Sequence, residues 1–135
     1  MFKLFYSPFH SFIHKILVTT HEAGLWDQVD FVAVYPFKNR DGEDQGDAYS
    51  IARITPLDKV PMIALEDGTC VYGSQAACEC IDAMGTSGHR LFPPEGPKRW
   101  DAITRRARAD TIFGATGMLA IEGGNPPEGQ RRSVF

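Results

Sequence analysis

The sequence predicts a mixed α/β fold over residues 1–84, followed by a helical segment. Two patterns carry this prediction. Within residues 2–34, a strand-like run, a helical run and a second strand-like run follow one another, which is the order of a right-handed βαβ unit with parallel strands. Residues 62–84 then have the pattern of a β-hairpin that leads directly into a helix. With a short helix expected between these parts, the element order is βαβ, α, ββα.

The βαβ unit begins with a strand over Phe2–Tyr6, whose side chains alternate between two faces. A helix is expected over Phe12–Glu22, with Gly24 just past its end. Its apolar face repeats at helical spacing through Ile13, Ile16, Leu17 and Thr20. The second strand is expected over Val29–Val34. A polar loop over 35–46 and a short helix over 48–54 should connect this unit to the hairpin.

The hairpin is expected to pair residues 62–65 with residues 69–72, because Asp67-Gly68 supplies the positive φ angles of a tight turn. Ser74 is a good helix N-cap, and Gly85 lies where a glycine after the last helical turn is expected. The core face of that helix is predicted to hold Ala77, Cys80, Ile81 and Met84.

The Val60-Pro61 step and Ser74 together suggest a ligand site. A proline at the head of a strand belongs at a bend or an edge. If its peptide bond is cis, the main chain of Val60 turns outward and could pair with an extended peptide. The Ser74 hydroxyl and the free N–H groups behind it could hold a carboxylate. The alternative is an ordinary edge hairpin followed by an ordinary capped helix.

The sequence divides into a domain at 1–84, a Gly- and Pro-rich linker at 85–97, and the start of a helical domain at 98–135. Within the linker, Leu91-Phe92 could anchor the segment to a core. A helix over 98–122 presents one stripe that holds Trp100, Ile103, Ala107, Thr111, Gly114, Met118 and Ile121. A further helix is expected to begin at 130–135. We therefore expect the helical domain to be incomplete in this chain.

Composition narrows the function classes. The 135 residues carry a net charge of −3, which favours neither nucleic acid nor membrane surfaces as partners, and no apolar run is long enough to span a bilayer. The odd count of cysteines, Cys70, Cys78 and Cys80, argues for buried free thiols in a reducing cytoplasm. His14 and His21 are about 10 Å apart along a helix, which is too far for them to share a metal ion. His10 and His14 lack a third ligand nearby, so we expect no metal site.

The sequence resembles the glutathione S-transferase family over nearly its whole length, and three segments carry the resemblance. They are YSPFHSFIHKILVTTHEAGL, TPLDKVPMIALEDGTCVYGSQAACECID and FPPEGPKRWDAI. The resemblance implies a thioredoxin-like first domain, glutathione as co-substrate without a metal, a homodimer, and a second domain of helices that begins here. It also implies the site residues. Lys59, Val60, Pro61, Gly73 and Ser74 would bind glutathione, with Pro61 cis, the Val60 main chain on the cysteinyl part and Ser74 on the γ-glutamyl carboxylate.

The resemblance leaves three residues for activating the thiol. Tyr6 aligns with the catalytic tyrosine of some relatives, His10 with the serine or cysteine of others, and Ser11 is next to it. A free thiol has a pKa near 8.5, so a donor beside the sulfur and a helix N-terminus would favour the thiolate. The residues at HSFI lack the C-x-x-C of dithiol redox proteins.

We therefore expect a cytoplasmic detoxification enzyme that conjugates glutathione to an electrophilic small molecule. The alternatives are a non-catalytic module of the same family that binds a ligand or a partner, and a truncated fragment.

Overall fold

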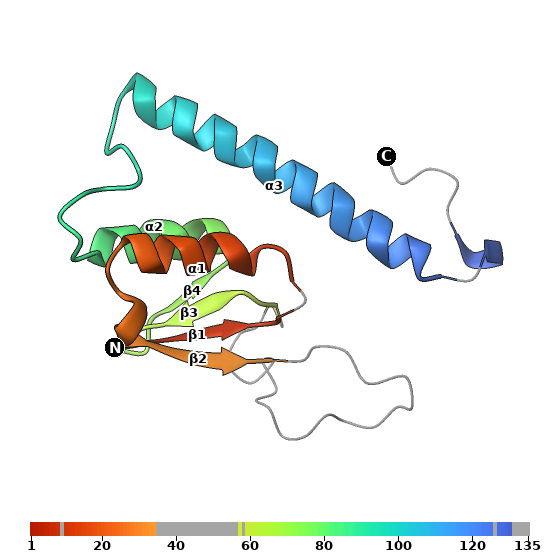
Figure 1. Ribbon diagram of the computed structural model, residues 1–135, viewed down its shortest axis with the longest axis horizontal. Coiled ribbons are helices and arrows are strands. Elements are labelled where there is room, and N and C mark those ends of the chain that lie inside the picture. The colour runs from red at the N-terminus through yellow and green to blue at the C-terminus, as the bar shows by residue number, and fades with distance from the viewer. Residues whose placement is uncertain (9, 35–56, 58, 126, 131–135) are drawn as a thin grey trace. The chain divides into compact units, whose positions relative to one another are not determined.

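The computed structural model describes residues 1–8, 10–34, 57, 59–125 and 127–130 (Figure 1). The chain forms two compact units, Met1–Phe92 and Pro93–Phe135, and each is described by itself. The loop expected over 35–46 and the helix expected over 48–54 lie outside the described residues.

The first unit contains a four-stranded mixed sheet in the order β2-β1-β3-β4 (Figure 1). Its strands are β1 (Phe2–Tyr6), β2 (Val29–Ala33), β3 (Met62–Ala64) and β4 (Cys70–Tyr72). β1 runs parallel to β2, with Phe2 opposite Val29, and antiparallel to β3. β3 and β4 pair antiparallel. The predicted parallel unit and the predicted hairpin are both confirmed.

Two helices lie side by side over one face of this sheet (Figure 1). They are α1 (Ile13–Glu22) and α2 (Ser74–Met84), and a 3₁₀ turn, η1 (Trp26–Gln28), leads into β2. Between helices and sheet, Leu4, Ile16, Ile63 and Ile81 are completely buried. Each such side chain contributes about 1.5–3 kcal/mol of transfer free energy, so this layer is the main source of stability. Phe5, Val34 and Met62 form a smaller cluster.

The C-terminal ends of α1 and α2 are tied together at glycines. Gly24 has a φ of +71°, and the Ala23 carbonyl accepts the N–H of Thr86 at 2.8 Å. Gly85 directly follows the last residue of α2, as expected, and is its C-cap, but its φ of −53° does not require glycine. A Cβ there would lie 3.2 Å from Ala23 Cβ and 3.1 Å from the Asp82 carbonyl oxygen. Close approach of the two helix ends therefore explains the glycine.

Asp82 is a buried acid on α2 that holds the chain segment after the helix. Its carboxylate accepts the N–H of Leu91 at 2.7 Å and that of Phe92 at 3.4 Å. The Arg90 guanidinium lies 3.9 Å away and donates to the Asp82 carbonyl. Phe92 packs against the core, as expected from the sequence. The acid thus fixes the last residues of the first unit.

The second unit is built on α3 (Pro97–Gly123), which confirms the helix expected over 98–122, and ends in η3 (Pro127–Gly129). Asp101 and Arg105 form an i,i+4 ion pair on α3 at 2.6 Å. Most of the helix predicted over 130–135 lies outside the described residues, and Gln130 is irregular. Among the described residues, no helix combines the length and the apolar character that a bilayer crossing requires.

Candidate functional site

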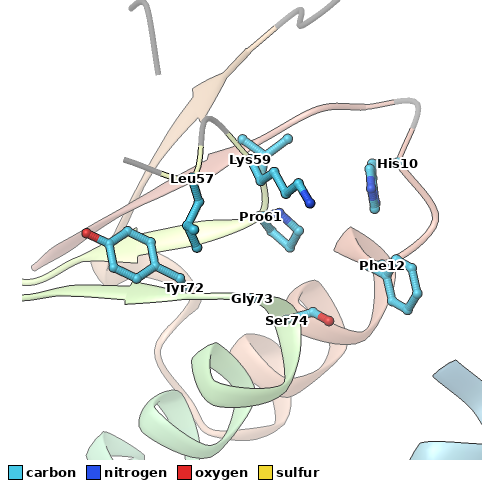
Figure 2. Close-up of a pocket in the computed structure, with 9 residues that line it drawn as sticks. His10, Phe12, Leu57, Lys59, Pro61, Tyr72, Gly73 and Ser74 are labelled. Atoms are coloured by element: carbon cyan, nitrogen blue, oxygen red, sulfur yellow. The ribbon is translucent and has the colours of Figure 1, made fainter. Parts of the chain in front are cut away.

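A pocket of about 270 Å³ lies where three segments of the first unit meet (Figure 2). The loop before α1 supplies His10 and Phe12, and the segment before β3 supplies residues 57 and 59–61. The junction of β4 and α2 supplies residues 72–74. All five residues expected to bind glutathione line this pocket, namely Lys59, Val60, Pro61, Gly73 and Ser74. The structure thus brings the two separate sequence motifs together.

The Val60-Pro61 peptide bond is cis, as expected. Pro61 is buried, and its carbonyl accepts the N–H of Gly73 at 3.2 Å, which joins the two motifs directly. Among the described residues, the main-chain N–H and C=O of Val60 have no hydrogen-bond partner. An unpaired donor and acceptor on one residue at a pocket are the groups that an extended peptide pairs with.

Ser74 was expected to be the N-cap of α2, and the structure corrects this. Gly73 is the N-cap, with φ of +79° and ψ of 144°, a conformation that favours glycine, and Ser74 is the first helical residue. The helix end has no side-chain cap, and the Ser74 hydroxyl has no partner among the described residues. In Figure 2 this hydroxyl points to the side of the pocket where His10 and Phe12 lie.

The N-terminus of α2 is also open to a ligand. The first main-chain bond of the helix runs from the Ala77 N–H to the Gly73 carbonyl at 3.0 Å. The N–H groups of Ser74, Gln75 and Ala76 precede it, and no described residue accepts from them. Helix N–H groups and a serine hydroxyl favour an anion, and Lys59 adds a positive charge to the same pocket.

His10 lies on the opposite wall of the pocket, in a loop held by main-chain bonds (Figure 2). The main-chain N–H of His10 donates to the Ser7 carbonyl, and the His10 carbonyl accepts the main-chain N–H of Ile13, both at 3.1 Å. The imidazole lies beside the Phe12 ring in a tilted arrangement, with centroids 5.4 Å apart and an angle of 39° between the ring planes. Its Nδ1 atom is buried and has no hydrogen-bond partner among the residues that the structure describes. Burial lowers the pKa of His10, which favours the neutral ring.

The other two residues expected near a thiol lie elsewhere. The Tyr6 ring meets Phe31 edge to face, with centroids 6.3 Å apart, and packs against the core between sheet and helices. Ser11 does not line the pocket, and its carbonyl accepts the N–H of His14. The N-terminal N–H groups of α1, at Ile13 and His14, are therefore bonded within the loop. Of the three candidates, only His10 faces the pocket, and the role of each stays a prediction.

The sequence did not reveal three further wall residues, which are Phe12, Leu57 and Tyr72. Tyr72 had a usable signal, because alternation along β4 places it on the face opposite Val71, beside the start of α2. Leu57 lies in a stretch without periodicity. Within the described residues, no three His, Cys, Asp or Glu side chains come together as a metal site would require.

The solved structures that resemble this chain include two glutathione transferases with bound glutathione. One is a glutathione transferase family member from Pseudomonas fluorescens Pf-5 with bound glutathione, 26% identical, with a TM-score of 0.82 over 97% of this chain and 61% of that one. The other is a glutathione S-transferase from Methylobacillus flagellatus KT with glutathione bound, 25% identical, with a TM-score of 0.82 over 98% and 60%. This chain thus spans about three fifths of either relative.

Comparison with curated proteins finds no match. The glutathione S-transferase N-terminal domain model matches residues 9–84, which is more than half of the chain. The match and the solved structures confirm the predicted fold class, a thioredoxin-like α/β domain followed by a helix. The chain belongs to the glutathione S-transferase family.

Proposed function

We propose that this protein binds glutathione in the pocket at Val60 and Ser74 and conjugates its thiol to an electrophilic small molecule. The observation that carries the proposal is the meeting of two unpaired sets of groups at one pocket. The Val60 main chain offers a donor and an acceptor, and the Ser74 hydroxyl and the N-terminus of α2 offer donors. The related structures named above contain glutathione, a peptide with a carboxylate at each end.

In the proposed complex, the Val60 N–H and C=O pair with the cysteinyl part of glutathione. Ser74 and the first N–H groups of α2 hold the γ-glutamyl carboxylate, and the Lys59 ammonium adds attraction for an anion. The cysteinyl sulfur would then face the loop that carries His10. Conjugation requires the thiolate, which attacks the electrophilic carbon and displaces its leaving group or adds across its double bond.

The apolar walls of the pocket suit an electrophile with a hydrophobic body. Phe12, Leu57 and Tyr72 provide these walls, so aryl or alkyl electrophiles are the proposed co-substrates. We also propose a homodimer, a cytoplasmic location and a role in detoxification, as the family resemblance implies. The free thiols at Cys70, Cys78 and Cys80 suit a reducing compartment.

Two measurements on the purified protein test the proposal. In a calorimetric titration, binding of glutathione should release or absorb heat. In a thermal melt, added glutathione should raise the melting temperature of the protein. An activated chloroarene should then be consumed faster with glutathione and protein than with glutathione alone. Absence of both signals would refute the proposed function.

A second candidate function is binding without catalysis. It is favoured by the positions of Tyr6 and Ser11, because neither of these two hydroxyl-bearing candidates for thiol activation lines the pocket. Retention of glutathione without any conjugation would support this alternative over the enzyme.

A further inference from the structure

In the part of the chain that the structure describes, two buried polar atoms of the loop before α1 lack hydrogen-bond partners, Ser7 Oγ and His10 Nδ1. Buried polar atoms without partners are rare and require an explanation. The orphaned nitrogen of His10 is the informative one, because the same ring lines the pocket. We propose that His10 stabilises the bound thiolate as a neutral hydrogen-bond donor through Nε2–H, with Nδ1 unprotonated. This inference rests on the proposed function and specifies how the thiol is activated.

The first step of the argument concerns the proton on Nδ1. A neutral imidazole carries one N–H, and an imidazolium carries two. If Nδ1 were protonated, the protein would bury an N–H with no acceptor in the described part of the chain, which is among the least tolerated states of a polar group. An unpaired acceptor nitrogen is tolerated better. The favoured tautomer therefore has its proton on Nε2.

The second step concerns charge. An imidazolium at this position would need the N–H on Nδ1 and would also lie in a pocket that contains the Lys59 ammonium. Among the described pocket residues there is no carboxylate to compensate it. The ring contacts the tilted ring of Phe12, a side chain that has no nitrogen or oxygen to accept a hydrogen bond. Burial also lowers the pKa of His10. These conditions all favour the neutral ring.

The third step follows the thiol proton. When glutathione binds, its S–H bond breaks and the proton goes to solvent buffer, because a neutral ring with a buried Nδ1 does not take it. The thiolate accepts the Nε2–H hydrogen bond and then forms the S–C bond with the electrophile, whose leaving group departs with the bonding electron pair. A proton-accepting His10 would instead keep the proton within the complex, so proton release distinguishes the two roles.

The experiment compares wild type with His10→Gln, His10→Ala and, as a control, His14→Ala. The amide N–H₂ of glutamine reaches the place of Nε2 and can donate, but it does not accept a proton at neutral pH. Calorimetry in two buffers of different ionisation enthalpy counts the protons released when glutathione binds. Ultraviolet absorbance of the thiolate gives the pKa of the bound thiol. Thermal melting of each variant confirms that it is folded.

We expect wild type to release protons at pH 7 as the thiolate absorbance appears. His10→Gln should keep the low thiol pKa and most of the release. His10→Ala should raise the thiol pKa toward its free value and lower the conjugation rate about 10- to 140-fold, which is the scale of one hydrogen bond to a charged group. His14→Ala should match wild type, because His14 is exposed and does not line the pocket.

Two results would overturn the inference while the proposed function stands. One is thiolate formation in wild type without proton release, because the proton would then be on His10. The other is a His10→Gln variant as impaired as His10→Ala, with both still binding glutathione. If wild type does not bind glutathione, the proposed function itself fails.

Discussion

Replacing Ser74 with alanine tests whether its hydroxyl serves the helix or a ligand. Loss of an N-capping serine costs about 0.5–2 kcal/mol of stability. In this structure Gly73 is the N-cap and the hydroxyl has no described partner. We therefore expect the free energy of unfolding without ligand to change by less than about 0.5 kcal/mol. A hydroxyl that donates to the γ-glutamyl carboxylate contributes about 1.5–3 kcal/mol, so the Kd for glutathione should rise about 10- to 140-fold.

The assay pairs urea denaturation of the free protein with calorimetric titration of glutathione. Gln75→Ala is the matched control, because Gln75 is the exposed next residue of α2 and does not line the pocket. Its two readings should both stay near wild type. The reasoning would be refuted if Ser74→Ala lost about 1 kcal/mol or more of stability and kept its affinity, since the serine would then act as a cap.

Three further predictions concern stability. Asp82→Ala should lower the free energy of unfolding by about 2–3 kcal/mol in urea denaturation, because two N–H groups lose a carboxylate acceptor, and Asp82→Asn should lower it less. If Asp82→Ala were as stable as wild type, these two bonds would contribute nothing. Gly85→Ala should lose about 1–3 kcal/mol, seen as a lower melting temperature, because its Cβ would crowd a carbonyl oxygen at 3.1 Å; an unchanged melt would show that the helix ends separate easily. The lowered pKa of His10 means that the unfolded chain binds more protons near and below pH 6.5, so stability from this residue is present above pH 6.5 and is lost on acidification. Urea midpoints at pH 7.5 and 5.5 should therefore fall more for wild type than for His10→Gln, and parallel falls would contradict this.

The elements that the sequence predicted well are those set by short-range chemistry. The turn at Asp67-Gly68 is an example, because Gly68 adopts a φ of +85° and the Asp67 carboxylate accepts the N–H of Thr69 at 2.8 Å. Both features depend only on residues that are neighbours in the sequence. Helices α1 and α3 were equally accessible, since their patterns extend over several turns.

The features that the sequence did not predict depend on distant residues. Ser74 has the side chain of an N-cap, but pairing between Gly73 and Pro61 sets where α2 begins. Asp82 is buried although its residue type favours the surface, because its partners come nine and ten residues later. The choice among Tyr6, His10 and Ser11 depends on the path of a loop, for which periodicity gives no information.

The position of β1 inside the sheet sets the order in which the first unit can be completed during synthesis. β1 pairs first with β2, and its other side waits for β3, which begins 29 residues after β2 ends. At typical translation speeds this delay is roughly 1.5–6 s, during which an apolar strand has an open edge. Open strand edges recruit other chains. A prematurely terminated product that stops before Met62 should therefore aggregate, whereas one that reaches Tyr72 can pair both edges of β1.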